Sequence, residues 1–337
     1  MKIVVDAMGG DFGPKVPVEG AVRASEEYGV DVILVGIEGV IKRELAKVGA
    51  QNSRITIVDA PEAIGMGDGI LSIRKTQHSS IRVGTQLVKD GGASAFVSMG
   101  NTAAVVYISK KTLGALKGVD KPGLALLLPN LKGLTLLIDV GANANCQAHH
   151  LVQFAVMGKI FMETAMGIAE PRIALMSIGE EKSKGNNLTK ETFSLLQDSP
   201  INFVGNLEGK DIFSGKADVI VSDGFTGNVA LKVSEGVVES LFSMVRNEVM
   251  KNFFAKIGLL LMKRNLKKIY KKVDYSEYGG AHLLGLNGVC IIGHGRSNVR
   301  AVKNAVRMSR EFVMKHIQDR IQTEMVRFEH VLRGVNV

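Results

Sequence analysis

The amino-acid sequence predicts an α/β protein whose sheet is doubly wound and largely parallel. Two observations support this class. Short apolar runs typical of buried strands recur along the chain, and helix-like segments separate most of them. The runs cover residues 3–5, 32–35, 55–58, 95–97, 134–138, 173–178, 202–204, 219–221 and 289–292. Because 46% of the 337 residues are hydrophobic, the chain can build a large core, and we expect one domain over residues 1–337.

Composition indicates the cellular compartment of the protein and the kind of partner that it binds. Cys146 and Cys290 are the only cysteines, which makes a disulfide framework improbable and favours a reducing cytosol. We expect no secretory signal and no membrane-spanning stretch. The net charge of +9 favours an acidic partner, which would be a nucleic acid, an anionic membrane or an acidic carrier protein. Aromatic residues make up only 5% and tryptophan is absent, so we expect no nucleic-acid partner.

Four of the predicted strands end in a short cluster of Gly, Asn, Asp, Ser and Thr, spanning residues 6–11, 98–102, 139–143 and 222–228. Such residues let the backbone turn sharply and leave N–H groups free at the next helix start, where phosphate binds well. We therefore expect a site for a phosphorylated or phosphate-like substrate at one edge of the sheet. Ordinary helix capping is the alternative for the Asn and Thr residues. The candidate binding residues, including those of two related loops, are Gly9, Gly10, Gly100, Asn101, Thr102, Gly141, Asn143, Asn186, Asn206, Gly224, Thr226 and Gly227.

The segment 251–272 stands out because it carries eight basic residues and no acidic residue. We predict two helices that meet near Gly258, with an apolar tip and basic flanks, within a protruding element over residues 236–273. One interpretation is a core or dimer helix with a solvated lysine face. The other is an element that lies on a membrane or docks a partner. The predicted contact residues are Lys251, Phe253, Phe254, Lys256, Leu259, Leu260, Leu261, Lys263 and Arg264.

Two other chemistries fit the sequence less well. Cys146, His149 and His150 lie close together after the third turn, but a lone Cys beside His in a helix is usually a packing residue. We expect no metal site and no cofactor. The dinucleotide pattern Gly-x-Gly-x-x-Gly is incomplete after both Gly65 and Gly293.

The motifs, taken in order, resemble those of the bacterial phosphate acyltransferases, the PlsX family. The resemblance rests on residues 6–11, 98–104, 139–143, 179–186, 203–208, 222–228 and 275–281, and it covers nearly the whole chain. It implies a fold similar to the isocitrate dehydrogenase and phosphotransacetylase group, and a homodimer. It also implies transfer of a fatty acyl group from acyl carrier protein to inorganic phosphate, which gives acyl phosphate for phospholipid (phosphatidic acid) synthesis.

The residues suit this reaction. Phosphate is already anionic near neutral pH, so the protein mainly has to hold it against the thioester carbon and stabilise the developing oxyanion. Lys184 is the predicted cation, although a solvated loop lysine is the alternative. The amide of Asn228 is the second predicted catalytic group. Asp6, Asp11 and Asp139 are expected to brace the loops, because their charges would repel an anion.

The chain departs from the family pattern at Ala103, where Gly is usual, and at Phe12, where His is common. Ala is tolerable where a helix begins, and Phe12 argues against an essential imidazole at that point. The resemblance and the basic segment together imply a cytoplasmic enzyme in peripheral contact with an anionic membrane. A membrane glycerol-3-phosphate acyltransferase is a further candidate partner. Two other functions stay open: an NAD-dependent dehydrogenase on a related fold, and a non-enzymatic carrier-binding or membrane-scaffold protein.

Overall fold

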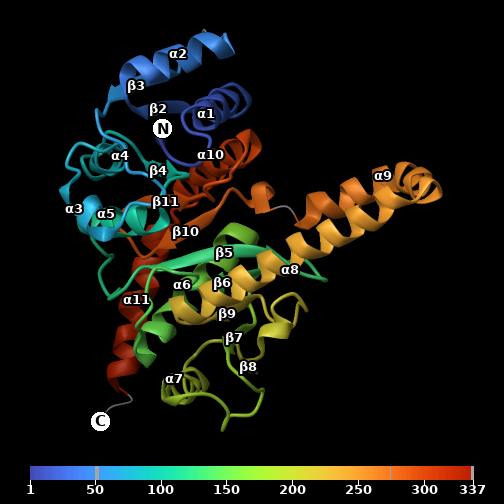
Figure 1. Cartoon of the computed structure of the whole chain (residues 1–337). Helices are drawn as coiled ribbons and strands as arrows, with labels where there is room; N and C mark the ends of the chain where they lie inside the picture. Colours follow the sequence, from blue (N-terminus) through green and yellow to red (C-terminus); the bar gives the residue numbers. More distant parts are fainter. Residues whose placement is uncertain (50–52, 274, 335–337) are drawn as a thin grey trace.

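The structure is a computed structural model that describes residues 1–49, 53–273 and 275–334. One sheet of 11 strands runs through these residues in the order β3-β2-β1-β4-β11-β10-β5-β6-β9-β7-β8 (Figure 1). The strands are β1 (Lys2–Asp6), β2 (Asp31–Gly36), β3 (Ile55–Asp59), β4 (Ala95–Ser98), β5 (Gly123–Pro129), β6 (Leu134–Ile138), β7 (Ile173–Met176), β8 (Phe203–Leu207), β9 (Val219–Val221), β10 (Ala281–Leu284) and β11 (Val289–Ile292). The predicted fold class is confirmed, because most neighbouring strands pair in parallel.

Two strands that the sequence analysis did not predict, β5 and β10, reverse the direction of the sheet. β10 pairs antiparallel with β11 and with β5, and β5 pairs antiparallel with β6. These three antiparallel pairings separate a parallel half that contains β1 to β4 and β11 from a parallel half that contains β6 to β9. The strands of the two halves therefore point in opposite directions.

Helices cover both faces of the sheet. Those of the described residues are α1 (Lys15–Tyr28), α2 (Glu38–Val48), α3 (Ile70–Lys75), α4 (Ser80–Lys89), α5 (Thr102–Leu113), α6 (Ala148–Met166), α7 (Asn187–Gln197), α8 (Gly224–Lys251), α9 (Phe253–Val273), α10 (Val299–Met314) and α11 (Ile317–Gly334), with 3₁₀ turns at Gly209–Asp211 and Tyr275–Tyr278. Apolar residues of α1, α2, α6, α7, α10 and α11 pack on one face. Those of α3, α4, α5 and the start of α8 pack on the other.

β1 shows why the central strands appear in the sequence as unbroken apolar runs. Ile3 and Val5 belong to one buried cluster, and Val4, whose side chain points the opposite way, belongs to the other. A strand covered on both faces needs apolar residues at every position rather than at alternate ones.

α8 and α9 form a hairpin that projects from the rest of the molecule (Figure 1). The prediction that the helices meet near Gly258 is wrong, because the break lies at Asn252. The backbone of Asn252 is extended, and its Oδ1 accepts the N–H groups of Phe254 and Ala255 at 2.8 and 3.3 Å, so it caps the second helix. Gly258 lies inside α9, where one glycine is tolerated. Among the described helices none is long and apolar enough to cross a bilayer.

Candidate functional site

The first two polar turns adjoin a third turn that the sequence analysis did not select. Residues 6–11 follow β1, residues 98–102 follow β4 and residues 293–298 follow β11, and these three strands are parallel neighbours. The N–H of Asp11 donates to the carbonyl of Gly295 at 2.8 Å, which joins the outer two turns. We call the three turns the first group. Residues 293–298, which match the dinucleotide pattern only incompletely, repeat the strand–turn–helix order of the other turns.

The carboxylate of Asp6 joins two turns of the first group through hydrogen bonds. Asp6 is 1% exposed, and its Oδ2 accepts the hydroxyl of Ser98 at 2.6 Å while its Oδ1 accepts the N–H of Met8 at 3.0 Å. Burial raises the pKa of Asp6, and these hydrogen bonds oppose that rise. A Cβ on Gly9 would lie 2.7 Å from the backbone nitrogen of Gly100, so the two turns approach too closely for a side chain at that point.

The start of α5 presents an exposed backbone N–H in the first group. Asn101 caps this helix, since its Oδ1 accepts an N–H of the first turn at 3.1 Å. Its Nδ2 donates to the carbonyls of Met66 and Asp68 at 3.0 and 3.1 Å, which anchors the neighbouring loop. Thr102 is exposed, and within residues 1–49, 53–273 and 275–334 nothing accepts its N–H. The positive end of the α5 dipole therefore faces solvent there.

The carboxylate of Asp139 accepts the N–H groups of the turn after β6, so these groups are not free to bind an anion. Asp139 is fully buried, and its two carboxylate oxygens accept five N–H bonds at 2.8–3.1 Å. The donors are the backbone N–H groups of Leu124, Gly141, Ala142 and Asn143 and the side-chain amide of Asn143. Burial raises the pKa of Asp139, while the five donors favour its charged form.

The first turn of α8 is likewise occupied, which corrects the expectation of free N–H groups at this helix start. Oδ1 of Asp223 accepts the N–H groups of Phe225 and Thr226 at 3.0 and 2.9 Å, and the N–H of Gly224 donates to a carbonyl of the neighbouring turn at 2.9 Å. A Cβ on Gly227 would overlap the carbonyl oxygen of Asp139. These glycines therefore permit close packing of α8 on the turn after β6.

Lys184 lies on the loop between β7 and α7. It is exposed, its backbone N–H donates to the carbonyl of Glu181 at 3.0 Å, and its ammonium has no hydrogen bond or ion pair within the described chain. Asn186 caps α7 by accepting the N–H of Thr189 at 2.9 Å. Asn206 is 4% exposed; it donates to the carbonyl of Glu181 at 3.2 Å, and its Oδ1 has no partner among the described residues. We call this loop and the turns after β6 and β9 the second group.

The structure does not place all the predicted residues at one edge of the sheet. The first group follows strands of one direction, and the second group follows β6, β7 and β9, which run the opposite way. The prediction of a single edge is therefore wrong. Its physical cause is the pair of unpredicted strands, because β5 and β10 turn the second half of the sheet around.

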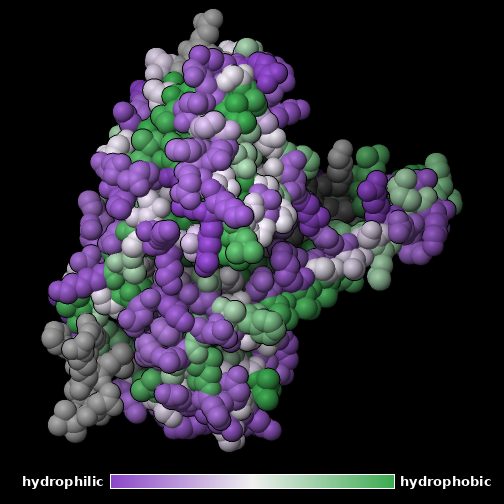
Figure 2. Space-filling model, turned by 60° about the vertical axis from the view of Figure 1, so that its left-hand side comes forward, coloured by the Kyte–Doolittle hydropathy of each residue, from purple (hydrophilic) through white to green (hydrophobic). Residues whose placement is uncertain are grey.

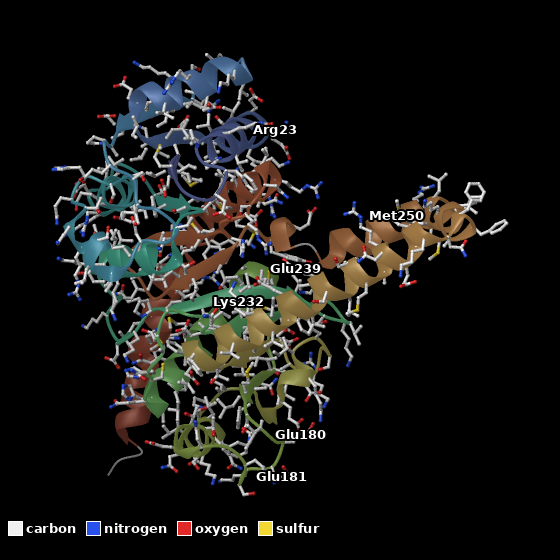
Figure 3. The ribbon with its side chains drawn as sticks, in the orientation of Figure 1. Arg23, Glu180, Glu181, Lys232, Glu239 and Met250 are labelled. Carbon is white, nitrogen blue, oxygen red and sulfur yellow. The ribbon has the colours of Figure 1, made fainter. Side chains whose placement is uncertain are left out.

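α8 connects the two groups instead. Asn228, in its first turn, lies against the second group, with its Cγ 3.7 Å from the position of a Cβ on Gly141. Lys232 and Glu235, on the following turns, lie close enough to His294 of the first group to influence its pKa. Farther along, Glu239 pairs with Arg296 at 2.6 Å. Figure 3 shows Lys232 and Glu239 along α8, with Glu180 and Glu181 of the Lys184 loop at the far end of the second half.

The surroundings of Cys146 favour its protonated thiol. Its Sγ donates to the carbonyl of Asn143 at 3.5 Å, and burial raises the pKa of the thiol to about 11, so the thiol stays protonated near neutral pH. Asp120, His149 and His150 hold potential metal ligands within 4.8 Å of one another. However, Nδ1 of His150 accepts the N–H of Gln147 at 2.8 Å, which leaves the proton on Nε2. His150 would have to give up this helix cap to ligate a metal ion.

The predicted contact residues of the hairpin lie on its outer part. Phe254 is 80% exposed and Leu261 is 79% exposed, whereas Leu259 is 39% exposed. Phe253, Lys256, Leu260 and Arg264 are exposed, and so is Lys251, which pairs with Glu248 at 2.7 Å. The side chain of Lys263 lies outside the described residues. Figure 2 shows apolar surface along the stem of the hairpin, the part that adjoins the rest of the molecule. The exposed apolar residues of α8 include Phe225, Val229, Val233, Val237 and Leu241.

Comparison with solved structures identifies the class of fold. A phosphotransacetylase from Streptococcus pyogenes superposes with a TM-score of 0.62, covers 94% of both chains and shares 18% sequence identity. At that identity the likeness concerns the fold alone.

Sequence comparison identifies the family. The Fatty acid synthesis protein family matches residues 1–320, and the chain belongs to this family, the PlsX family of phosphate acyltransferases. It is 47% identical over 326 residues to the phosphate acyltransferase of Geobacter sulfurreducens, covering 96% of this chain and 94% of that one. It is also 47% identical over 338 residues to that of Pelotomaculum thermopropionicum, covering 100% of this chain and 98% of the other. Acyl transfer to phosphate is the reaction class that these relatives support.

Proposed function

We propose that this chain transfers a fatty acyl group from acyl carrier protein to inorganic phosphate and so supplies acyl phosphate for phosphatidic acid synthesis. The observation that carries the proposal is the match to phosphate acyltransferases over nearly the whole chain. The net charge of +9 supports an acidic carrier as the donor, because opposite charge speeds encounter.

In this proposal phosphate attacks the thioester carbonyl carbon directly. A C–O bond forms, the C–S bond breaks, and sulfur leaves with the bonding electrons as the carrier thiolate. Lys184 supports this role because its ammonium is unpaired within the described chain and exposed on a loop of the second group. Asn228 is the proposed hydrogen-bond donor, because it lies at the same sheet edge, against the turn after β6. Because the thiol of Cys146 is protonated near neutral pH, it is a weak nucleophile, and we expect no acyl-enzyme on this residue.

The test is to mix the protein with palmitoyl-carrier protein and measure release of carrier thiol with and without phosphate. We expect release to require phosphate, to yield acyl phosphate, and to need no added nucleotide. Release at an equal rate without phosphate would show a thioesterase instead. In the same assay Lys184→Ala should lower kcat roughly 10²–10³-fold if the ammonium stabilises phosphate or the oxyanion. Lys182→Ala, two residues away on the same loop, is the matched control.

We further propose that the enzyme is a cytoplasmic homodimer that contacts an anionic membrane through the tip of the hairpin. There it would pass its product to a membrane glycerol-3-phosphate acyltransferase. The exposed apolar stem on α8 supports a second copy as the partner of that surface. The exposed phenylalanines and leucines of α9, flanked by basic residues, support a lipid surface as the partner of the tip.

Replacing Leu259, Leu260 and Leu261 by Gln should release the enzyme from phosphatidylglycerol vesicles while leaving carrier-thiol release largely intact. Each inserted leucine contributes up to about 1.5–3 kcal/mol, so three changes remove up to about 4.5–9 kcal/mol of apolar contribution at full burial. Vesicle flotation and sedimentation velocity are the measurements. Leu131→Gln, a change at a 90% exposed leucine outside the hairpin, is the control. A triple variant that floats normally, or that becomes monomeric, would contradict the membrane role of the tip.

A further inference from the structure

A buried side chain of the sheet holds the exposed loop that contains Lys184. The loop covers residues 177–186, between β7 and α7, and most of its residues are exposed. Asn206, near the end of β8, is 4% exposed, and its Nδ2 donates to the carbonyl of Glu181 at 3.2 Å. Asn206 is itself fixed by the sheet, because it lies in register with Leu175 of β7. The strand therefore anchors the loop from below.

The carbonyl that Asn206 contacts is also the acceptor for the backbone of Lys184. The N–H of Lys184 donates to the carbonyl of Glu181 at 3.0 Å and so closes a turn between the two residues. The side chain of Lys184 then passes over Gly179, where a Cβ would lie 2.8 Å from Cγ of the lysine. Because these contacts join the turn and the first carbons of the lysine, a shift of the turn would also move the ammonium group.

Three other side-chain contacts reach the loop at 2.9–3.5 Å. They run from Glu180 to Lys216, from Lys182 to Gln197, and from Ser177 to the carbonyl of Lys184. All three are exposed to solvent, where ion pairs and hydrogen bonds compete with water and contribute little. The bond from Asn206 is partly buried and comes from a rigid strand. We therefore expect it to determine where the turn lies above the sheet.

The side chain of Asn206 is otherwise a poor choice for the stability of the fold. Its Oδ1 is buried and accepts no hydrogen bond from any residue that the structure describes. A buried amide oxygen without a donor costs stability, and an apolar side chain would avoid that cost. The benefit of an amide at this point is therefore the bond that its N–H makes to the loop. Local departures of this kind are typical of functional sites.

We propose that Asn206 is a positioning residue for Lys184. Its amide holds the turn at Glu181, and this keeps the lysine ammonium where it stabilises phosphate and the developing oxyanion. The inference rests on the proposed function. It gives Asn206 an indirect role in place of the direct substrate contact that the sequence analysis predicted. Asn206 forms no bond to the substrate in this role, and it neither gains nor loses a proton.

Asn206→Ala removes the amide and leaves Lys184 in the chain. We expect kcat for phosphate-dependent thiol release to fall roughly 10–10²-fold, because a misplacement of about 1 Å is enough for such a loss. The KM for palmitoyl-carrier protein and the thermal unfolding temperature should stay nearly unchanged. Asn202→Ala is the matched control, because its Nδ2 also donates to a carbonyl at 3.2 Å, but to that of Glu170, outside the loop. Its kcat should stay normal.

A double-mutant cycle tests whether Asn206 acts through Lys184. In a Lys184→Ala background, Asn206→Ala should lower kcat by less than about twofold, because the group that it positions is already absent. Hydrogen exchange gives a second measurement that does not depend on catalysis. The N–H of Lys184 should exchange roughly 2–10-fold faster in Asn206→Ala than in the unmodified protein, and Asn202→Ala should leave this rate unchanged.

Three results would overturn the proposal. The first is a pair of losses from Asn206→Ala and Lys184→Ala that multiply in the double variant, as expected for a direct substrate contact. The second is normal kcat in a folded Asn206→Ala variant. The third is loss of the fold both in Asn206→Ala and in Asn206→Leu, which would make the residue structural.

Failure of this inference is distinguishable from failure of the proposed function. If the unmodified enzyme releases thiol only with phosphate and Lys184→Ala is slow, while Asn206→Ala is normal, the proposed function stands and this inference alone fails. If the unmodified enzyme shows no phosphate-dependent release, or if Lys184→Ala has normal kcat, the proposed reaction or the role of its lysine fails first, and this inference fails with it.

Discussion

Replacing Asp139 by Ala should lower the free energy of unfolding by about 3–5 kcal/mol, which is a large share of the total for a typical domain. The reason is the number of donors that it satisfies. Five N–H bonds converge on a fully buried carboxylate, and alanine would leave the four backbone donors without this acceptor, while the amide of Asn143 would keep its bond to the carbonyl of Pro122 at 2.7 Å. Asp139→Asn should cost less, because one oxygen remains, but its amide would face donors on the other side.

Asp223→Ala is the matched control for this change. Asp223 also accepts backbone N–H bonds at a turn, but it is only half-buried and caps the start of α8, so its loss should cost about 1 kcal/mol. Urea unfolding of the three variants measures the differences. An Asp139→Ala variant within about 1 kcal/mol of the unmodified protein would show that the turn after β6 is not held by its carboxylate.

The second large effect concerns acid stability, and it comes from His282. This residue of β10 is 1% exposed, its ring stacks on Phe312 at 4.3 Å between centroids, and it forms a T-shaped pair with Phe161 at 5.2 Å between centroids. Neither ring nitrogen has a hydrogen-bond partner within the described chain. Burial lowers the pKa of His282 from 6.5 to about 3.

The sign of the pH effect follows from these two pKa values. Between about pH 6.5 and pH 3 the unfolded chain binds a proton at His282 that the folded chain does not. Stability is therefore full above pH 6.5 and falls as the pH drops, by about 1.4 kcal/mol per unit once the unfolded form is protonated. From about pH 7.5 to pH 5 the expected loss from this residue is roughly 2 kcal/mol.

His282→Leu should remove this loss, so its stability should fall less steeply with acid than that of the unmodified protein. Urea unfolding at both pH values measures the slope. His78→Leu, a change at an exposed histidine, should leave the slope unchanged. Equal slopes in the unmodified protein and His282→Leu would mean that the buried ring is protonated as easily as a free one.

His282 also illustrates what the sequence analysis had no means to find. A histidine between apolar residues gives no local sign of its partners, and here its neighbours come from α6 and α10, far away in the chain. The turn that contains His294 has no clear local signal for a related reason. Its glycines match a dinucleotide pattern incompletely, and only the pairing of β11 with β4 shows that they join the other turns.

The sequence by itself determined the α/β class, most of the strands and the family, because these depend on apolar runs and on motifs that are local in the chain. It also predicted that Asp6 and Asp139 brace loops, because their charges would repel an anion, and in the structure both carboxylates accept backbone N–H bonds. Only the tertiary structure decided which motifs come together. β5 and β10 reverse the sheet and place the two groups of turns at opposite edges, and α8 then connects them. Strand direction depends on pairing between distant segments, which no local pattern of residues records.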